Sequence, residues 1–328
     1  MNIAEIAKMA GVSKAAVSRY LNNGYISEEK REAIRKVVEE TGYRPSVQAQ
    51  TLRTRKTRMI GVIVPKISST SVARVVEGIL STLNERGYQM LLAVAQSDPA
   101  RELEYLHAFH SKQVDGVVLN ATIFTPEHKR VLKDCAVPVV IVGQQLPGYC
   151  AVFHDDYHAS YDLTRLLLDK GRRKLGYISG DLRDQAAGAK RYAGFCDAVR
   201  DMDCEGLADH FVTADFSVAS GYEQAGKLLD KYKSLDGLLC ATDTIAVGAA
   251  RYLREHGIKS PEQILVAGHG DSEMARMTYP PLITAHYFYE KSGETAVQML
   301  MEQLEGREGA VREVKLDYYI VDRSEDRH

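Results

Sequence analysis

The chain has 328 residues, of which 45% are hydrophobic and 26% are charged, and its formal net charge is −2. This composition is typical of a soluble globular protein, the length favours two domains, and no apolar run approaches the length of a membrane-spanning helix. The five cysteines are scattered without metal-ligand spacing, so they predict no metal site and fit a reducing cytoplasm.

The near-neutral total hides an uneven distribution of charge. Residues 1–58 contain 12 Lys and Arg against 6 Asp and Glu, whereas the remainder contains 30 against 38. A small basic module on a large acidic one indicates a polyanionic partner for the first module only.

The first module begins with two short helices around a tight turn, within residues 2–21. Asn2 is a suitable N-cap with Glu5 three residues on, as in a capping box, and Gly11 supplies a helix stop. Ser13 caps the second helix. Two helices joined in this way predict a helix-turn-helix whose second helix is free for the major groove; an ordinary helical hairpin is the alternative. The outward positions of the second helix are Lys14, Ala15, Ser18 and Arg19.

Further elements extend this module. A third amphipathic helix is expected from the N-cap Ser27 to about Thr41, with Gly42 as its stop. The segment 46–53 is short and potentially helical. A basic string follows, made of Arg53, Arg55, Lys56 and Arg58.

These residues carry a specific set of motifs. AxxAGVSxxxVSRxLN, then SxxxR, GYRPSxxAQxL and MIGVIVP, resemble the LacI/GalR family of bacterial transcription repressors, over essentially the whole chain. The resemblance implies a DNA-binding domain at 1–45, a hinge helix and linker at 46–57, and an effector-binding and dimerisation domain at 58–328. It implies a non-enzymatic repressor that binds a palindromic operator as a homodimer under the control of a small molecule.

From residue 58 onward, apolar strands alternate with amphipathic helices, and the alternation occurs twice. This predicts two lobes, each a doubly wound parallel sheet. The resemblance implies a periplasmic-binding-protein-like fold in which the chain crosses between lobes three times, near Tyr157, His286 and Arg312. The expected strands are 59–65, 89–95, 116–119, 137–142, 175–179, 237–241, 264–268 and 314–321, with a short one after Pro281. The expected helices are 75–86, 101–113, 127–133, 157–169, 190–201, 220–232, 245–256 and 291–304.

The resemblance assigns DNA contacts residue by residue. Lys14, Ala15 and Arg19 match base-facing positions, and a solvated helix face is the alternative for the two cations. In the hinge helix, Leu52 matches the apolar wedge that enters the minor groove. The alternative is that Leu52 packs on the large domain. The other expected contacts, mostly with phosphates, are Ser13, Ser18, Asn22, Ala49, Arg53 and Arg55.

A second set of residues matches the family's effector site between the lobes. Arg191, in an RxxGF block, matches the arginine that holds ligand oxygens, and Phe216 matches a stacking aromatic residue. Asp155 and Asp243 are ligand contacts or helix caps. The remaining expected contacts are Ser69, Ser71, Thr242 and Asp271.

The stretch GHGDS at 268–272 departs from the family pattern. The usual ligand-binding aspartate position is Gly270, and the carboxylate moves on to Asp271. This form resembles the sucrose-type repressors of the family. The expected effector is a sugar or sugar phosphate, with Lys66 or Lys190 as a further phosphate contact, and the alternatives are a non-sugar metabolite or a protein corepressor.

Other classes of function find less support. An α/β enzyme would be expected to show a GxGxxG, Walker or GxSxG motif, and none appears. His154–His158 lacks the spacing of a standard metal site, and no cofactor is expected. A secreted solute-binding protein would begin with a signal peptide, whereas this chain begins with a capped helix, which predicts a cytoplasmic protein.

Overall fold

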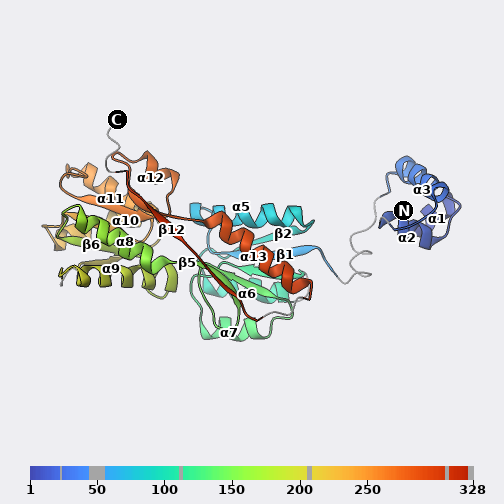
Figure 1. Cartoon of the computed structure of the whole chain (residues 1–328), viewed down its shortest axis with the longest axis horizontal. Helices are drawn as coiled ribbons and strands as arrows, with labels where there is room; N and C mark the ends of the chain where they lie inside the picture. Colours follow the sequence, from blue (N-terminus) through green and yellow to red (C-terminus); the bar gives the residue numbers. More distant parts are fainter. Residues whose placement is uncertain (23, 44–55, 111–113, 205–208, 307–309, 324–328) are drawn as a thin grey trace. The chain divides into compact units, whose positions relative to one another are not determined.

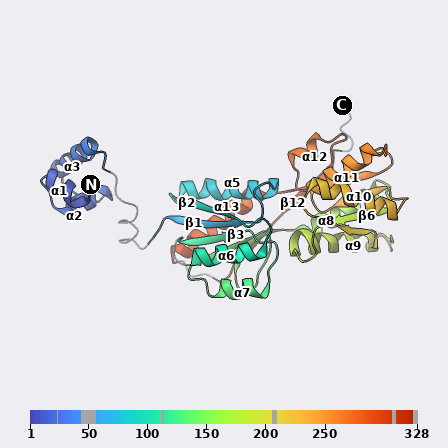
Figure 2. The ribbon, with the colours of Figure 1, turned by 180° about the vertical axis from the view of Figure 1, so that it is seen from behind.

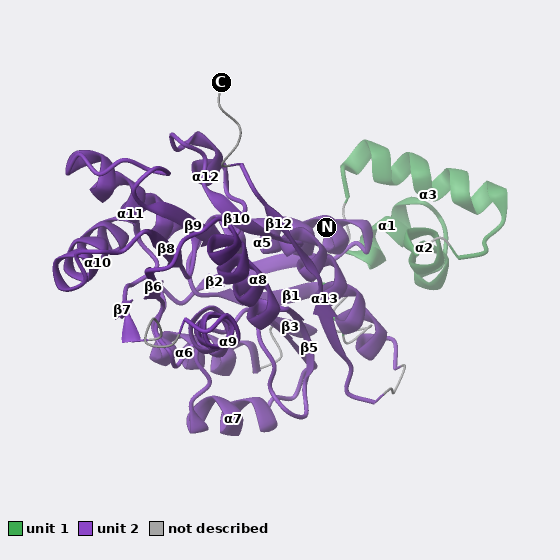
Figure 3. Cartoon of the chain, turned by 60° about the vertical axis from the view of Figure 1, so that its left-hand side comes forward, with its two compact units in different colours: residues 1–58 green, residues 59–328 purple. Residues whose placement is uncertain are grey.

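The computed structural model describes residues 1–22, 24–43, 56–110, 114–204, 209–306 and 310–323 (Figures 1 and 2). The chain separates into two compact units, Met1–Arg58 and Met59–His328 (Figure 3). The segment expected to form the hinge helix, 46–53, lies outside the described residues.

The first unit is a small helical domain. Asn2 and Glu5 form the expected capping box, in which Asn2 Oδ1 accepts from the Glu5 amide and the Glu5 carboxylate accepts from the Asn2 amide. Gly42 adopts a φ of 61° and ends the third helix, as expected. One core joins all three helices, and its fully buried members include Ile6, Val17 and Ile34. The helices are α1 (Ile3–Met9), α2 (Lys14–Leu21) and α3 (Glu28–Thr41).

The second unit contains two α/β lobes. In the N-lobe, six described strands form a parallel sheet in the order β11-β5-β4-β3-β1-β2. Side chains of β1 alternate between two cores: Val62 and Val64 face α5 and α13, whereas Ile63 faces α6 and α7. A strand buried on both faces explains the unbroken apolar run. The strands are β1 (Met59–Val64), β2 (Gln89–Val94), β3 (Gly116–Leu119), β4 (Val139–Val142), β5 (Cys150–His154) and β11 (Glu313–Leu316), and the helices are α5 (Thr70–Glu85), α6 (Pro99–His110), α7 (Pro126–Lys133) and α13 (Tyr289–Leu304).

The C-lobe repeats this architecture. Its six described strands follow the order β12-β10-β9-β8-β6-β7, and only the β10–β12 pair among them is antiparallel. Helix α8 packs on α9, and α10 packs on α11 (Figure 2). The strands are β6 (Leu175–Ser179), β7 (Phe211–Thr213), β8 (Gly237–Cys240), β9 (Leu265–His269), β10 (Ile283–Tyr287) and β12 (Tyr318–Val321). The helices are α8 (Asp156–Asp169), the π-helix η1 (Gln185–Lys190), α9 (Arg191–Asp201), α10 (Val218–Lys231), α11 (Asp243–Glu255) and α12 (Glu273–Met277).

The chain passes between the lobes at three points. The first two, at Asp155 and Phe288, lie close to the expected positions. The expected third crossing near Arg312 is wrong, as is the single strand 314–321. The chain instead crosses at Asp317, between β11 in one sheet and β12 in the other. Two short strands separated by one residue have the same apolar pattern as one strand, so the change of sheet leaves no sequence signal.

The doubly wound architecture of both lobes is confirmed. Strands β5 and β7 and helix α12 were not expected, because each is short and has no strong period of its own. Among the described residues, none of the helices combines the length and apolar character needed to cross a bilayer.

Candidate DNA-binding surface and effector site

Helix α2 presents one buried and one exposed face. Ala16 and Val17 enter the core of the first unit, whereas Lys14, Ala15 and Arg19 are exposed. The helix carries no acidic residue, and neither cation forms an ion pair with the described residues. The exposed face is therefore positively charged and available to a polyanion.

The polar residues around α2 partly serve the helix itself. The Ser13 hydroxyl accepts a hydrogen bond from the Ala16 amide at 3.2 Å and caps the helix. The side-chain amide of Asn22 donates to the Ser18 carbonyl oxygen one turn earlier. The other expected DNA contacts, Ala49, Leu52, Arg53 and Arg55, lie outside the described residues.

Arg191 lies at the centre of a buried polar cluster in the second unit. Its Nε and Nη2 atoms lie 2.8 and 2.7 Å from Asp156 Oδ1, and its Nη1 donates to the Ala241 carbonyl at 2.5 Å. The guanidinium also lies 4.9 Å from the centre of the Tyr287 ring. Because both charged side chains are less than a tenth exposed, each depends on the other for charge compensation.

Aromatic residues from both lobes surround this pair. His154 ends β5 in the N-lobe, and its ring centre lies 5.1 Å from those of both Tyr287 and Tyr289. His269 ends β9 in the C-lobe and stacks parallel to Tyr287 at 6.4 Å. The cluster thus occupies the carboxyl ends of strands in both sheets, where open α/β sheets bind ligands.

Burial controls the charge of these histidines. It lowers the pKa of His154 to about 4, although the nearby Asp156 carboxylate opposes the shift. Burial and the Arg191 charge lower the pKa of His269 well below its ordinary value. Both imidazoles are therefore neutral at pH 7.

Two further contacts join the lobes near this cluster. Lys190 Nζ donates to Gln145 Oε1 at 3.1 Å and lies 5.1 Å from the centre of the Phe153 ring. Arg74 Nη1 lies 3.5 Å from the Gly270 carbonyl oxygen. Side chains of each lobe thus contact the other lobe at two further points.

Two of the expected effector contacts have structural partners. Asp155 caps α8 and accepts from Lys315 Nζ at 2.6 Å. Asp243 is 2% exposed and accepts from the Ser272 amide and the Thr284 hydroxyl. Both arrangements favour a structural role.

Asp271 is likewise directed into the C-lobe. Its carboxylate contacts Arg276, His286 and Arg323 at 2.6 to 3.3 Å. Burial would raise its pKa, but these hydrogen bonds outweigh burial and lower the pKa to about 2. The Asp271 carboxylate thus connects Arg276 of α12 and Arg323, after β12, with His286 of β10.

The remaining expected contacts lie at the carboxyl ends of strands. Ser69 and Ser71 begin α5, with their hydroxyls 3.0 Å apart. Thr242 caps α11, and Phe216 packs on Gly180, where a Cβ would lie 2.5 Å from the ring. These side chains stand at the same edges of the sheets as Arg191.

Sequence reasoning located Arg191 but missed its partners Asp156, His154, Tyr287 and Tyr289. All four lie at or beside crossings between lobes, so their proximity depends on the path of the chain. Only His269, within the unusual GHGDS, had a local signal.

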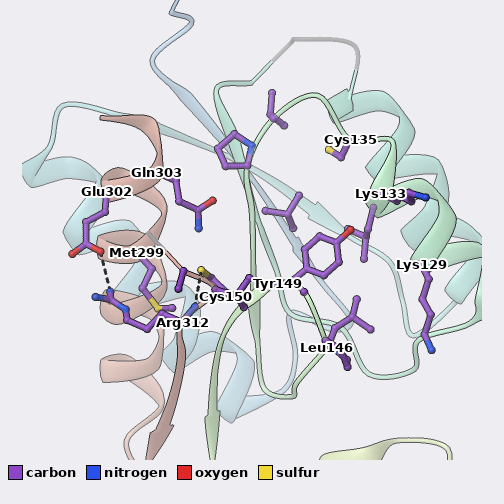
Figure 4. Close-up of a pocket in the computed structure, with 18 residues that line it drawn as sticks. Lys129, Lys133, Cys135, Leu146, Tyr149, Cys150, Met299, Glu302, Gln303 and Arg312 are labelled. Carbon is purple, nitrogen blue, oxygen red and sulfur yellow. Dashed lines mark hydrogen bonds and ion pairs between the residues drawn. The ribbon is translucent and has the colours of Figure 1, made fainter. Parts of the chain in front are cut away.

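A separate pocket lies at the opposite ends of the N-lobe strands (Figure 4). It has a volume of about 850 Å³ between α7 and the end of α13, with Tyr149 and Leu146 between them. None of the expected effector contacts lines it. Within the described part of the chain, no group of three or more His, Cys, Asp or Glu side chains is placed to hold a metal ion.

Comparison with known proteins agrees with this arrangement. Residues 2–46 match the family "Bacterial regulatory proteins, lacI family", and residues 164–324 match a "Periplasmic binding protein-like domain". The chain is 32% identical to the sucrose operon repressor of Staphylococcus xylosus, over 93% of this chain and 94% of that protein. It is 28% identical to the transcriptional repressor PurR of Pectobacterium carotovorum, over 98% and 95% of the two chains.

A solved structure supports the fold. The Lac repressor dimer bound to operator and the anti-inducer ONPF matches 98% of both chains with a TM-score of 0.90 at 23% identity. A helix-turn-helix head with an exposed cationic helix, two lobes and a relative above 30% identity thus agree. The chain belongs to the LacI family of bacterial transcriptional regulators, as a DNA-binding, non-enzymatic repressor with an effector-binding domain.

Proposed function

We propose that this repressor binds a palindromic operator as a homodimer and that a sugar or sugar phosphate, bound between its lobes, sets its affinity for that operator. The Arg191 cluster carries the proposal: both lobes contribute to it, so a ligand there has different contacts in open and closed arrangements. Such a ligand shifts the equilibrium between the two arrangements. The similarity to a sucrose operon repressor supports a sugar, and the similarity to PurR makes a purine the second class to test.

An exposed apolar patch supports the dimer. Met277 and Tyr279, at and after the end of α12, are 84% and 88% exposed, and Met274 is 38% exposed. Grouped exposed side chains of this size are typical of protein interfaces. Sedimentation of the purified chain tests this assignment: Tyr279→Asp is expected to shift a dimer towards the monomer, and an unchanged sedimentation coefficient would argue against this face.

DNA binding is tested with fluorescently labelled duplexes. The intact chain is expected to prefer a palindromic operator, selected from random sequence, over scrambled duplex by at least tenfold at moderate salt. Lys14→Ala and Arg19→Ala are expected to weaken operator binding by about 1–3 kcal/mol if they contact bases. Lys30→Ala, on α3, is the control for loss of a positive charge from the head. Equal affinity for every duplex would reject the proposal.

A further inference from the structure

The pocket in Figure 4 has the size and the lining of a small-molecule site. Its volume of about 850 Å³ falls within the range of roughly 300–1,000 Å³ that such sites occupy. The amino ends of β4 and β5, the segment before β11 and the carboxyl ends of α7 and α13 enclose it. The buried side chains of Leu132, Val139, Leu146 and Met299 give it apolar walls. An apolar part of a ligand would therefore be shielded from water here.

Cations outnumber anions in the lining of this pocket. Lys129 and Lys133 stand one turn apart on α7, and neither forms an ion pair within the described ranges of the chain. Arg312 Nη2 lies 3.1 Å from Glu302 Oε2, which belongs to the one acid among the described lining residues. Asp134 lies near Tyr149 but lines a separate hollow. Because the chain after residue 58 is acidic overall, these two lysines are a local positive charge that favours an anion.

Two neutral polar side chains complete the lining. Burial raises the pKa of Tyr149, so its hydroxyl stays protonated at pH 7 and can donate a hydrogen bond. Gln303 extends from α13 towards the strands, and its amide can donate as well (Figure 4). The pocket thus combines apolar walls with several donors and two free positive charges, which suits a ligand that has both an apolar body and an anionic group.

Two elements connect this pocket with the Arg191 cluster. Strand β5 begins at Cys150 in the pocket and ends at His154 in the cluster. Helix α13 begins at Tyr289, beside His154, and reaches the pocket at Met299. Closely packed elements transmit strain, so a molecule that shifts α13 or β5 at one end affects the other end. The pocket is therefore placed to influence the arrangement of the lobes.

We infer that this pocket is a second ligand site, that it takes an anion with an apolar body, and that its occupant alters operator affinity. A carboxylate or phosphate group would bind Lys129 and Lys133, while a hydrocarbon or aromatic body would cover Leu146 and Met299. The site is distinct from the one between the lobes and does not depend on which effector binds there. Its regulatory part rests on the proposed function, whereas ligand binding does not.

Isothermal titration of the full-length chain tests the class of ligand. The probes are octanoate, octyl phosphate, octanol and octylammonium, which share one hydrocarbon body and differ in their head groups. We expect octanoate or octyl phosphate to bind at least tenfold more tightly than octanol and octylammonium, and the tighter of the two anions identifies the head group. Equal binding of octanol, tighter binding of octylammonium, or no binding of either anion would overturn the inference.

Substitutions at the pocket test where the anion binds. The double variant Lys129→Gln with Lys133→Gln is expected to weaken binding of the anion about tenfold. Val311→Trp, at a lining position that is 51% exposed, is expected to reduce binding by filling the pocket without disturbing the core. Lys227→Gln with Lys231→Gln, also one turn apart but on α10, is the matched control and should leave binding unchanged. If both pocket variants bind like the wild type, the anion lies elsewhere and the inference is wrong.

Operator affinity is measured on the same preparations, with and without the anion that binds. At least a twofold change is expected for the wild type, and the change is expected to disappear in the double variant on α7. Binding of the anion without any change in operator affinity would overturn the regulatory part of the inference. If the chain does not discriminate operator from scrambled duplex, the proposed function itself fails.

Discussion

Arg191 and Asp156 compensate each other's charge, because both side chains are buried. Removing one partner leaves a buried charge unpaired, so Arg191→Ala is expected to lower the free energy of unfolding by about 3–5 kcal/mol. The double variant Arg191→Met with Asp156→Asn removes both charges. Its loss in free energy of unfolding is expected to be smaller than the summed losses of Arg191→Met and Asp156→Asn made singly. Urea unfolding measures all of these variants at pH 7. Strict additivity would contradict the pairing.

This coupling has a practical consequence for ligand studies. Arg191→Ala changes the fold and the site together, so loss of effector binding in that variant would not by itself identify a contact. His269→Asn, whose amide can keep the hydrogen bond to the Cys240 carbonyl oxygen, separates the two effects better.

His154 predicts a pH dependence of stability. Its pKa is about 4 in the folded chain and about 6.5 when unfolded, so the unfolded chain binds more protons between these values. The contribution of neutral His154 to the free energy of unfolding is fully present above pH 6.5. It falls as the pH drops towards 4, by up to about 1.4 kcal/mol per pH unit. His154→Asn is therefore expected to lose less stability than the wild type between pH 6.5 and 5.

Other groups make that comparison between variants necessary. Burial raises the pKa of Asp184 to about 6, so its contribution changes in the opposite direction, weakening as pH rises. The difference between wild type and His154→Asn isolates the histidine. His256→Asn, at an exposed position, is expected to follow the wild-type curve; identical pH dependence in all three proteins would refute the assignment.

The site was only partly predictable from the sequence. Arg191 stands in a motif and could be found alone, but its interaction with Asp156 depends on the packing of α9 against α8. His154 and Tyr287 belong to different lobes and meet only because the chain crosses between them. The pattern of residues along the sequence does not by itself predict such contacts between lobes; only the resemblance to a known family does.

Helices of this protein pair through glycines that permit close backbone approach. A Cβ on Gly221 of α10 would lie 2.3 Å from the Ile245 carbonyl oxygen of α11, whereas one on Gly226 would meet the Tyr252 ring at 2.7 Å. The backbone cannot move aside without separating the helices, but a ring can rotate. Gly221→Ala is expected to cost about 1–3 kcal/mol. Thermal unfolding compares it with Gly226→Ala, the control in the same helix, and equal losses would contradict the argument.

Regular elements were predicted best where local chemistry defines their ends. The capping box at Asn2 and the stop at Gly42 occur as expected, and β3 and β6 have the expected bounds. The prediction failed for 314–321, where Asp317 separates strands of different sheets. Local sequence determines that a segment is extended, whereas its neighbours in space determine which sheet it joins.

At the scale of the whole molecule, the proposed function requires that lobe closure and operator binding be coupled. An effector between the lobes gains contacts from both, so it favours the closed arrangement, to which the Lys190–Gln145 hydrogen bond also contributes. Lys190→Ala is therefore expected to weaken effector binding about two- to tenfold. The same substitution is expected to move operator affinity in the direction opposite to that caused by the effector.

The sign of that second change identifies the regulatory logic, because coupling between two sites is reciprocal. Stronger operator binding by Lys190→Ala, measured without effector, indicates an inducer, and weaker binding indicates a corepressor. Lys233→Ala, which breaks an exposed pair with Asp230 within the C-lobe, is the control and should change neither affinity. If Lys190→Ala weakens effector binding and leaves operator affinity unchanged, closure of the lobes is not the step that controls DNA binding.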